Sequence, residues 1–162
     1  MLASVNLKDF FEELCLHRRI TNFFIKNKHI FSIIYKQIFV NGKEINKKNT
    51  ENEPNVNMKI EEGKEYVLIM WDPDAPQSSW VHWIVLYKKN KNKLEKTDIL
   101  EYQGPNPPSG THHYFFSLYL KPNQLSLQAI PQERGYFNIN QFESINQLQK
   151  INEVYMLVSK IN

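Results

Sequence analysis

The segment that decides the fold is Trp71–Trp83, WDPDAPQSSWVHW, which follows the apolar run Tyr66–Met70. Runs of apolar, β-branched and aromatic residues are typical of strands, and Pro73 ends this one because proline has no N–H to donate to the sheet ladder. The sequence therefore predicts a strand that stops at the rim of a sheet and holds two carboxylates there, Asp72 and Asp74.

A second strand is predicted directly after the turn, over Trp80–Tyr87. Because side chains alternate along a strand, two faces are expected: His82, Ile84 and Leu86 on one, and Val81, Trp83 and Val85 on the other. If the two strands are neighbours in one sheet, an aspartate of the turn can accept a hydrogen bond from one ring nitrogen of His82. The alternative interpretation is that the aspartates only close Asx turns and that the histidine is half-buried with its polar atoms satisfied.

Another unusual segment, Gly104–Phe116, has the sequence GPNPPSGTHHYFF and leads from a proline-rich loop into a strand. Alternation places His112 and Tyr114 on one face of that strand and His113 on the other. The loop is stiff and loses little entropy when a ligand binds, and its glycines let a ligand approach the main chain. Imidazole, phenol and backbone N–H donors together suit a small oxyanion such as phosphate, with the neighbouring acids keeping the histidines protonated.

The remainder of the sequence has the turn spacing of a β-rich protein. Strands are expected at 30–35, 36–40, 58–60, 66–71, 80–87, 99–102, 113–120 and 154–160. The best candidate for a hairpin turn is Asn41-Gly42. Helical spacing predicts a short helix over 7–16 and another over 140–148, the latter capped by Asn138 or Asn140.

Length and composition favour one folded domain over residues 1–162, since no repeat, linker or low-complexity tract divides the chain. Cys15 is the only cysteine, and the N-terminus lacks the basic and apolar regions of a signal peptide, which indicates a reducing, cytoplasmic setting. The longest apolar patch is too short to span a bilayer. The net charge of +3 comes mostly from lysines in loops rather than from arginines with interleaved aromatics, so no nucleic-acid partner is expected.

These motifs, in this order, resemble the two signature segments of the phosphatidylethanolamine-binding protein family, also called the Raf kinase inhibitor protein family. The resemblance lies in DPDAP followed by HW, and in GPNPPSGTHHY followed by a strand that ends in Leu118-Tyr119. Asn41-Gly42, the lead-in GKEYVLIMW, and Arg134–Phe137 with Phe142 also resemble family patterns. The similarity covers residues 30 to 160, and two long motifs in the correct order are a specific signal.

The resemblance implies a mainly β fold, a sandwich of two antiparallel sheets with one or two short peripheral helices. It also implies a small rim pocket for phosphate-type anions, formed by Asp72, Asp74, Pro76, Trp80, His82, Gly104, His112 and Tyr114. The peptide bond Ala75–Pro76 is a candidate for the cis form. Two departures from the family pattern stand out. His113 replaces the usual arginine, which is expected to weaken an ion pair between the two loops, and the chain ends without the C-terminal helix of animal members, which is expected to leave the pocket open.

The function implied is a non-enzymatic regulator of kinase signalling or similar pathways, which binds a phosphate-bearing small molecule or a phospholipid head group. A kinase or phosphoprotein partner and peripheral membrane contact fit this interpretation, in the cytoplasm or, for a viral protein, the host cytoplasm. No cofactor or metal is expected. The alternative is a hydrolase or metal-dependent enzyme in which Asp72, His82 and His112 converge. The chain has neither a G-x-S-x-G nucleophile elbow nor a G-x-x-x-x-G-K-[ST] phosphate loop.

Overall fold

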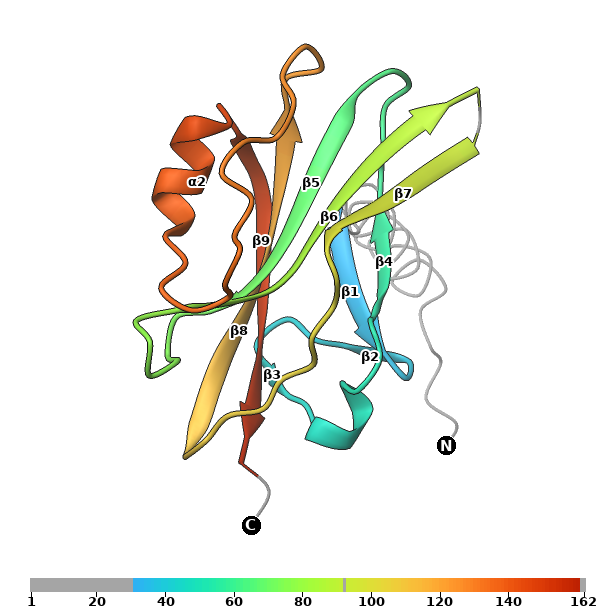
Figure 1. Cartoon of the computed structure of the whole chain (residues 1–162). Coiled ribbons are helices and arrows are strands. Elements are labelled where there is room, and N and C mark those ends of the chain that lie inside the picture. Colours follow the sequence, from blue (N-terminus) through green and yellow to red (C-terminus); the bar gives the residue numbers. More distant parts are fainter. Residues whose placement is uncertain (1–30, 92, 161–162) are drawn as a thin grey trace, which may run out of the picture. The chain divides into compact units, whose positions relative to one another are not determined.

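The computed structural model describes residues 31–91 and 93–160, most of which lie in two β-sheets (Figure 1). In chain order the elements are β1 (Phe31–Tyr35), β2 (Ile38–Phe39), β3 (Lys43–Glu44), the 3₁₀ turn η1 (Lys47–Asn49), β4 (Asn55–Met58), β5 (Glu65–Asp72), β6 (Trp80–Asn90), β7 (Lys93–Leu100), β8 (Thr111–Lys121), α2 (Ile139–Ile145) and β9 (Gln149–Ser159). The helix expected over 7–16 lies outside the described residues. Within the described part, no helix is long and apolar enough to cross a membrane.

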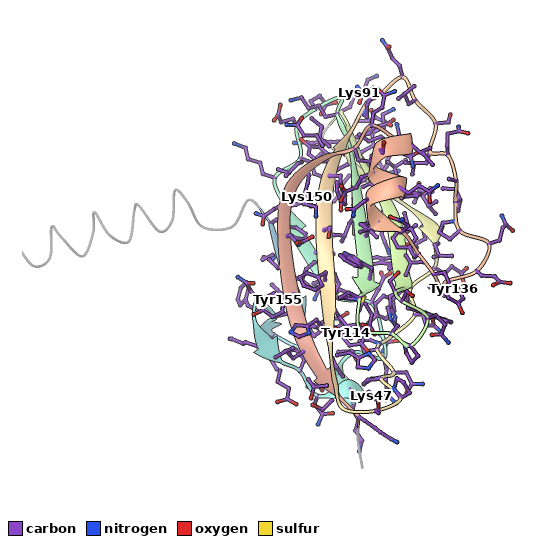
Figure 2. All side chains as sticks on the ribbon, turned by 90° about the vertical axis from the view of Figure 1, so that its left-hand side faces the viewer. Lys47, Lys91, Tyr114, Tyr136, Lys150 and Tyr155 are labelled. Atoms are coloured by element: carbon purple, nitrogen blue, oxygen red, sulfur yellow. The ribbon has the colours of Figure 1, made fainter. Side chains whose placement is uncertain are left out.

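The strands form a three-stranded sheet in the order β2-β1-β4 and a six-stranded sheet in the order β3-β9-β8-β5-β6-β7. Neighbouring strands pair antiparallel, except that the two-residue β3 runs parallel to β9. Figure 2 shows the small sheet on one side of the large sheet and α2 on the other side. The predicted sandwich with a short peripheral helix is therefore confirmed.

Alternation along β5 divides the core into two clusters. Leu68 and Met70 face the small sheet and pack with Phe31 of β1 in the larger cluster. Val67 and Ile69 face the opposite way and belong to the cluster that includes the helix residue Phe142. A central strand that is buried on both faces needs a continuous apolar run, which explains the sequence YVLIM at this position.

A β-bulge interrupts the alternation predicted for β6. Val81 pairs with Trp71 and Trp83 pairs with the preceding residue, Met70, so His82 is an extra residue between the two pairs. Trp83 lies in the cluster between the sheets, whereas Val81 joins the cluster on the helix side. The prediction that Val81 and Trp83 share one face is wrong, because a bulge changes the phase of a strand without leaving a mark in its periodicity.

The turn chemistry also differs from expectation. Asn41-Gly42 forms a turn, but β2 pairs with β1 and β3 pairs with β9, so the turn carries the chain from one sheet to the other instead of closing a hairpin. The tight hairpin is β1–β2, where Lys36 and Gln37 have φ values of 43° and 71°. Positive φ at both central residues is the geometry of a type I′ turn, which Asn-Gly usually supplies.

The helix α2 begins one residue earlier than expected. Asn138 is its N-cap, and the side chain of Asn138 accepts a hydrogen bond of 3.0 Å from the N–H of Gln141. At the other end, Asn146 caps the helix and binds the backbone of Gln128 through both side-chain atoms. Asn138 therefore caps the start of the helix, and Asn146 joins its end to the segment that contains Gln128.

Candidate functional site

The site is a rim cavity of about 290 Å³. Its lining residues are Asp72, Ala75, Pro76, Gln77, Trp80, His82, Gln103, Asn106, Pro108, His112 and Tyr114. Six of the eight residues implied by the resemblance line it, and the other two, Asp74 and Gly104, do not. Figure 2 shows Tyr114 at the same end of the fold as Lys47, which contacts the lining residue Asn106.

Strand order brings these residues together. The large sheet has β5 between β6 and β8, and both neighbours run antiparallel to β5. The C-terminal end of β5 therefore meets the N-terminal ends of β6 and β8 at one rim. Asp72 lies opposite Trp80 of β6, and the next residue back, Trp71, lies opposite Phe115 of β8.

A buried hydrogen bond between Asp72 and His112 joins the two segments. The His112 Nδ1 atom lies 2.7 Å from Asp72 Oδ2, and the N–H of Asp74 donates to Asp72 Oδ1 at 2.8 Å. Both side chains are buried. Burial raises the pKa of the Asp72 carboxyl, although the hydrogen bonds from His112 and Asp74 act in the opposite direction. Because a carboxylate can only accept, His112 donates through Nδ1.

His82 has a different partner from the one expected. Its Nδ1 atom donates to the backbone carbonyl of Gln103 at 2.8 Å, so the expectation of an aspartate partner is wrong for this residue. The side chain is buried, and burial lowers the pKa of the imidazole to about 4, with the Arg134 guanidinium adding to that shift. His82 is therefore neutral at neutral pH, rather than held protonated by a nearby acid. With Nδ1 protonated, the lone pair lies on Nε2.

Tyr114 completes the inner wall between the two histidines. Its ring meets His82 edge-on, with centroids 5.1 Å apart, and is nearly parallel to His112 with centroids 6.4 Å apart. Burial raises the pKa of the Tyr114 phenol, and the charge of Asp72 raises it further, so the hydroxyl stays neutral. The prediction that His112 and Tyr114 share one strand face is confirmed by their common place in the cavity wall.

His113 lies on the opposite face, as the alternation predicts, and still connects the two loops. Its backbone N–H and its Nδ1 atom both lie 2.8 Å from Asp74 Oδ2. Burial acts to raise the pKa of Asp74, but these two bonds outweigh it, and the pKa of that carboxyl is lowered. Histidine thus takes over the bracing contact whose loss was expected from the absent arginine. The ring also stacks on Phe115 and makes a tilted contact with Tyr155.

The cavity residue Asn106 is held by Lys47 of the 3₁₀ turn η1. Lys47 Nζ donates to Asn106 Oδ1 at 2.5 Å, and a lysine ammonium can only donate. The amide oxygen of Asn106 therefore faces Lys47, and Asn106 lines the cavity. Sequence reasoning missed both residues, because Asn106 lies in an irregular loop and Lys47 is 59 residues away along the chain.

Gly104 lies in the same loop as Asn106 but does not line the cavity. A Cβ atom added at this glycine would lie 2.6 Å from the carbonyl oxygen of Thr50, which is closer than van der Waals contact allows. The hydroxyl of Tyr102 donates to that same oxygen at 2.7 Å. Glycine is therefore required at 104 for close backbone packing rather than for ligand approach.

Two further expectations concern the first loop and a metal. The Ala75–Pro76 peptide bond is trans, so the cis form implied by the resemblance is not found. The chain reverses instead through Ser78, whose φ is +66°. Among the described residues, no group of three or more His, Cys, Asp and Glu side chains is arranged to hold a metal ion.

Comparison with known proteins agrees with the class indicated by the fold and the rim cavity, a β-sandwich binding protein. The family model for phosphatidylethanolamine-binding protein matches residues 35–157. The chain belongs to the phosphatidylethanolamine-binding protein family.

Among curated proteins, the chain is 34% identical over 86 residues to the protein BROTHER of FT and TFL 1 of Arabidopsis thaliana, an alignment that covers 49% of each chain. It is 36% identical over 92 residues to the protein MOTHER of FT and TFL1 homolog 2 of Oryza sativa subsp. japonica, covering 51% of this chain and 53% of the relative. The chain thus spans about half the length of these relatives.

Solved structures of low sequence identity share the fold. A phosphatidylethanolamine-binding protein from Plasmodium vivax superposes with a TM-score of 0.66 at 21% identity, covering 81% of this chain and 85% of that one. A carboxypeptidase Y inhibitor, solved in complex with its cognate proteinase, superposes with a TM-score of 0.70 at 20% identity, covering 81% and 83% of the two chains.

The packing of Gly104 gives a first testable prediction. Gly104→Ala is expected to lower the free energy of unfolding by about 1–3 kcal/mol, because the Thr50 backbone must move to admit the methyl group. Chemical denaturation measures the change. Ser109→Ala, in an exposed part of the same loop, is the control and should stay within about 0.5 kcal/mol of the parent. Equal stability of both variants would contradict the packing role.

The neutral state of His82 gives a second prediction. Its folded pKa of about 4 lies below the ordinary value of 6.5, so the unfolded state binds the proton first as the pH falls. Stability is expected to be lost between about pH 6.5 and pH 4, with this histidine contributing about 3 kcal/mol of that loss. Denaturation across that range should show a smaller acid loss for His82→Phe than for the parent. Ser109→Ala, at an exposed residue that does not titrate, is the control and should keep the parent's slope.

Proposed function

We propose that this chain is a non-enzymatic binding module that holds a phosphate-type anion, free or as a phospholipid head group, in the rim cavity. Through that site it regulates a protein partner such as a kinase or phosphoprotein in the cytoplasm. The observation that carries the proposal is the buried Asp72–His112 pair beside Tyr114 in a cavity of about 290 Å³. The volume suits a small head group rather than a peptide or a nucleotide.

The donors of the wall suit an anion. Lys47 occupies the amide oxygen of Asn106, which leaves the Asn106 NH₂ group as a donor, and the neutral Tyr114 hydroxyl is hydrogen-bonded to Asp72. His112 can donate through its second ring nitrogen when its ring is charged. Hydrogen bonds from neutral and charged donors in a partly desolvated pocket are the usual means of holding a small oxyanion.

The contacts of the serines give no support to a hydrolase. Ser79 is the buried serine nearest in sequence to His82, and its hydroxyl donates to the backbone carbonyl of Phe137. His82 directs its Nδ1 proton to a carbonyl, and His112 directs its own to a carboxylate. A nucleophilic serine needs a histidine within hydrogen-bond reach, and none of the contacts of these three side chains provides that pair. Metal analysis of the purified protein, before and after phosphate soaking, tests the metal-dependent alternative directly.

The proposed site predicts a localised response to phosphate. In a titration of ¹⁵N-labelled protein followed by NMR, signals from 72–82 and from 103–114 should shift together, because both segments form the cavity wall. Sodium chloride at matched ionic strength is the control and should not move these signals. Shifts confined to the lysine-rich β6–β7 turn would indicate surface electrostatics and contradict the proposal.

The orientation of Asn106 gives a sharper prediction. Asn106→Asp keeps the size of the side chain and its contact with Lys47, but it replaces the NH₂ donor with a carboxylate oxygen. Phosphate affinity, measured by calorimetry, is expected to fall by at least about tenfold, since a charged acceptor then faces the anion.

The matched control for this variant is Asn123→Asp, which makes the same charge change at an exposed residue outside the cavity wall. Its phosphate affinity should equal that of the parent apart from a small, salt-sensitive effect of net charge. An equal loss in both variants would mean that the Asn106 amide makes no direct contact with the ligand.

A further inference from the structure

The wall of the rim cavity contains a fixed acceptor as well as donors. The backbone carbonyl of Gln103 has no proton to give, so the 2.8 Å contact assigns the proton of His82 to Nδ1. A neutral imidazole then has only a lone pair at Nε2. His82 lines the cavity, and its Nδ1 edge is used by Gln103, so the ring offers the cavity an acceptor and no donor.

The groups around His82 keep the ring in this state. The Arg134 guanidinium donates to the backbone carbonyl of His82 at 2.8 Å and places a positive charge behind the bulge. Burial lowers the pKa of His82, and Arg134 and His112 add to the shift. The other titratable groups of the wall are Asp72, which is engaged by His112, and Tyr114, a neutral phenol. Neither has a proton for His82 Nε2, because the Tyr114 hydroxyl is hydrogen-bonded to Asp72 and the carboxylate can only accept.

An oxyanion with no hydrogen of its own would bring a second lone pair against His82 Nε2. A buried acceptor that loses water and gains no donor is costly, whereas a ligand hydroxyl at the same position forms a hydrogen bond. The wall thus has a donor at Asn106 and an acceptor at His82. A wall with both a donor and an acceptor can distinguish ligands by whether they carry a hydrogen-bond donor, and not only by their charge.

We propose that the cavity selects an anion that carries its own hydrogen-bond donor next to the charged oxygens, such as the P–OH group of a protonated phosphate monoester. The proposal rests on the proposed function and narrows it to a ligand class. A phosphodiester has no P–OH group, so a diester head group can satisfy the same wall only if it brings another donor, such as an ammonium group. Sulfate esters, which match the shape and charge of the protonated monoester but carry no hydrogen, should bind more weakly.

A matched pair of ligands tests the proposal on the unaltered protein. At about pH 5.5, methyl phosphate is mostly a monoanion with one P–OH, since its second ionisation lies near pH 6, and methyl sulfate is a monoanion with none. Calorimetry should show methyl phosphate binding at least about tenfold more tightly. Raising the pH to about 8 removes the P–OH hydrogen and should erase most of that preference, while methyl sulfate binding changes little.

The outcomes separate the two proposals. If neither ester binds, the proposed anion site is wrong and this inference falls with it. If both bind with equal affinity at the lower pH, the anion site stands and the inference is overturned. Tighter binding of methyl phosphate at the higher pH, where it carries a second negative charge, would also overturn it, because charge and not the hydrogen would then decide affinity.

A second pair of ligands identifies the source of the donor. Dimethyl phosphate and glycerophosphoethanolamine are both diesters without P–OH, and only the second has an ammonium group. If glycerophosphoethanolamine matches methyl phosphate and dimethyl phosphate does not, the donor is the ammonium of a lipid head group. If both diesters bind weakly, the donor is the P–OH of a monoester. Tight binding of dimethyl phosphate at the lower pH overturns the proposal.

The tautomer of His82 can be read without any ligand. Long-range ¹H–¹⁵N NMR spectra of the labelled protein should show His82 with Nδ1 protonated and Nε2 unprotonated, and the Nε2 signal should move when methyl phosphate binds. A proton on Nε2 in the free protein would overturn the proposal. In His82→Phe, which keeps a flat ring without the acceptor, the ratio of methyl phosphate to methyl sulfate affinity should fall toward one. If that variant does not fold, the spectra and the ligand pairs on the parent protein still decide.

Discussion

The buried hydrogen bond between Asp72 and His112 is the interaction on which the rest of the site depends. It ties the end of β5 to the start of β8 in the interior, where a carboxylate without partners would be costly. Asp72 also accepts the N–H of Asp74, which sets the first loop and leaves the Asp74 carboxylate for His113. His82 has a backbone carbonyl as its partner instead, and burial keeps its ring neutral.

Much of the fold could be predicted because the relevant signals are local. The apolar run before Pro73 marks the central strand, and the alternation in β8 correctly separates His112 and Tyr114 from His113. The charged strand β7 was expected only at its end, over 99–102, because most of its side chains are exposed at the sheet edge and carry no apolar pattern. The hairpin turn at Lys36-Gln37 has no Asn-Gly signal, and only the pairing of β1 with β2 determines it.

The sequence predicted most of the residues that line the cavity, but not the hydrogen bonds between them. Motif position gave six of the cavity residues, since they lie at strand ends that antiparallel pairing brings together. Which acid binds which histidine depends on the bulge at His82, and a bulge has no periodic signature. Lys47 and Asn106 are joined by tertiary packing around Gly104, so no local pattern could pair them. The predictions that were wrong or missing thus concern side chains whose direction depends on one extra residue in a strand or on one long-range contact.

The same bulge explains why a pocket with so many histidines need not be strongly cationic. If His82 followed the regular alternation, it would share a face with Ile84; as the extra residue of the bulge, it reaches the cavity wall, where burial removes its charge. Asp72 offsets the charge that His112 gains when it is protonated. The wall then attracts ligands less through net charge than through the placement of donors and one acceptor. A site of that kind discriminates between ligands of equal charge by their hydrogen atoms, which a cluster of surface lysines cannot do.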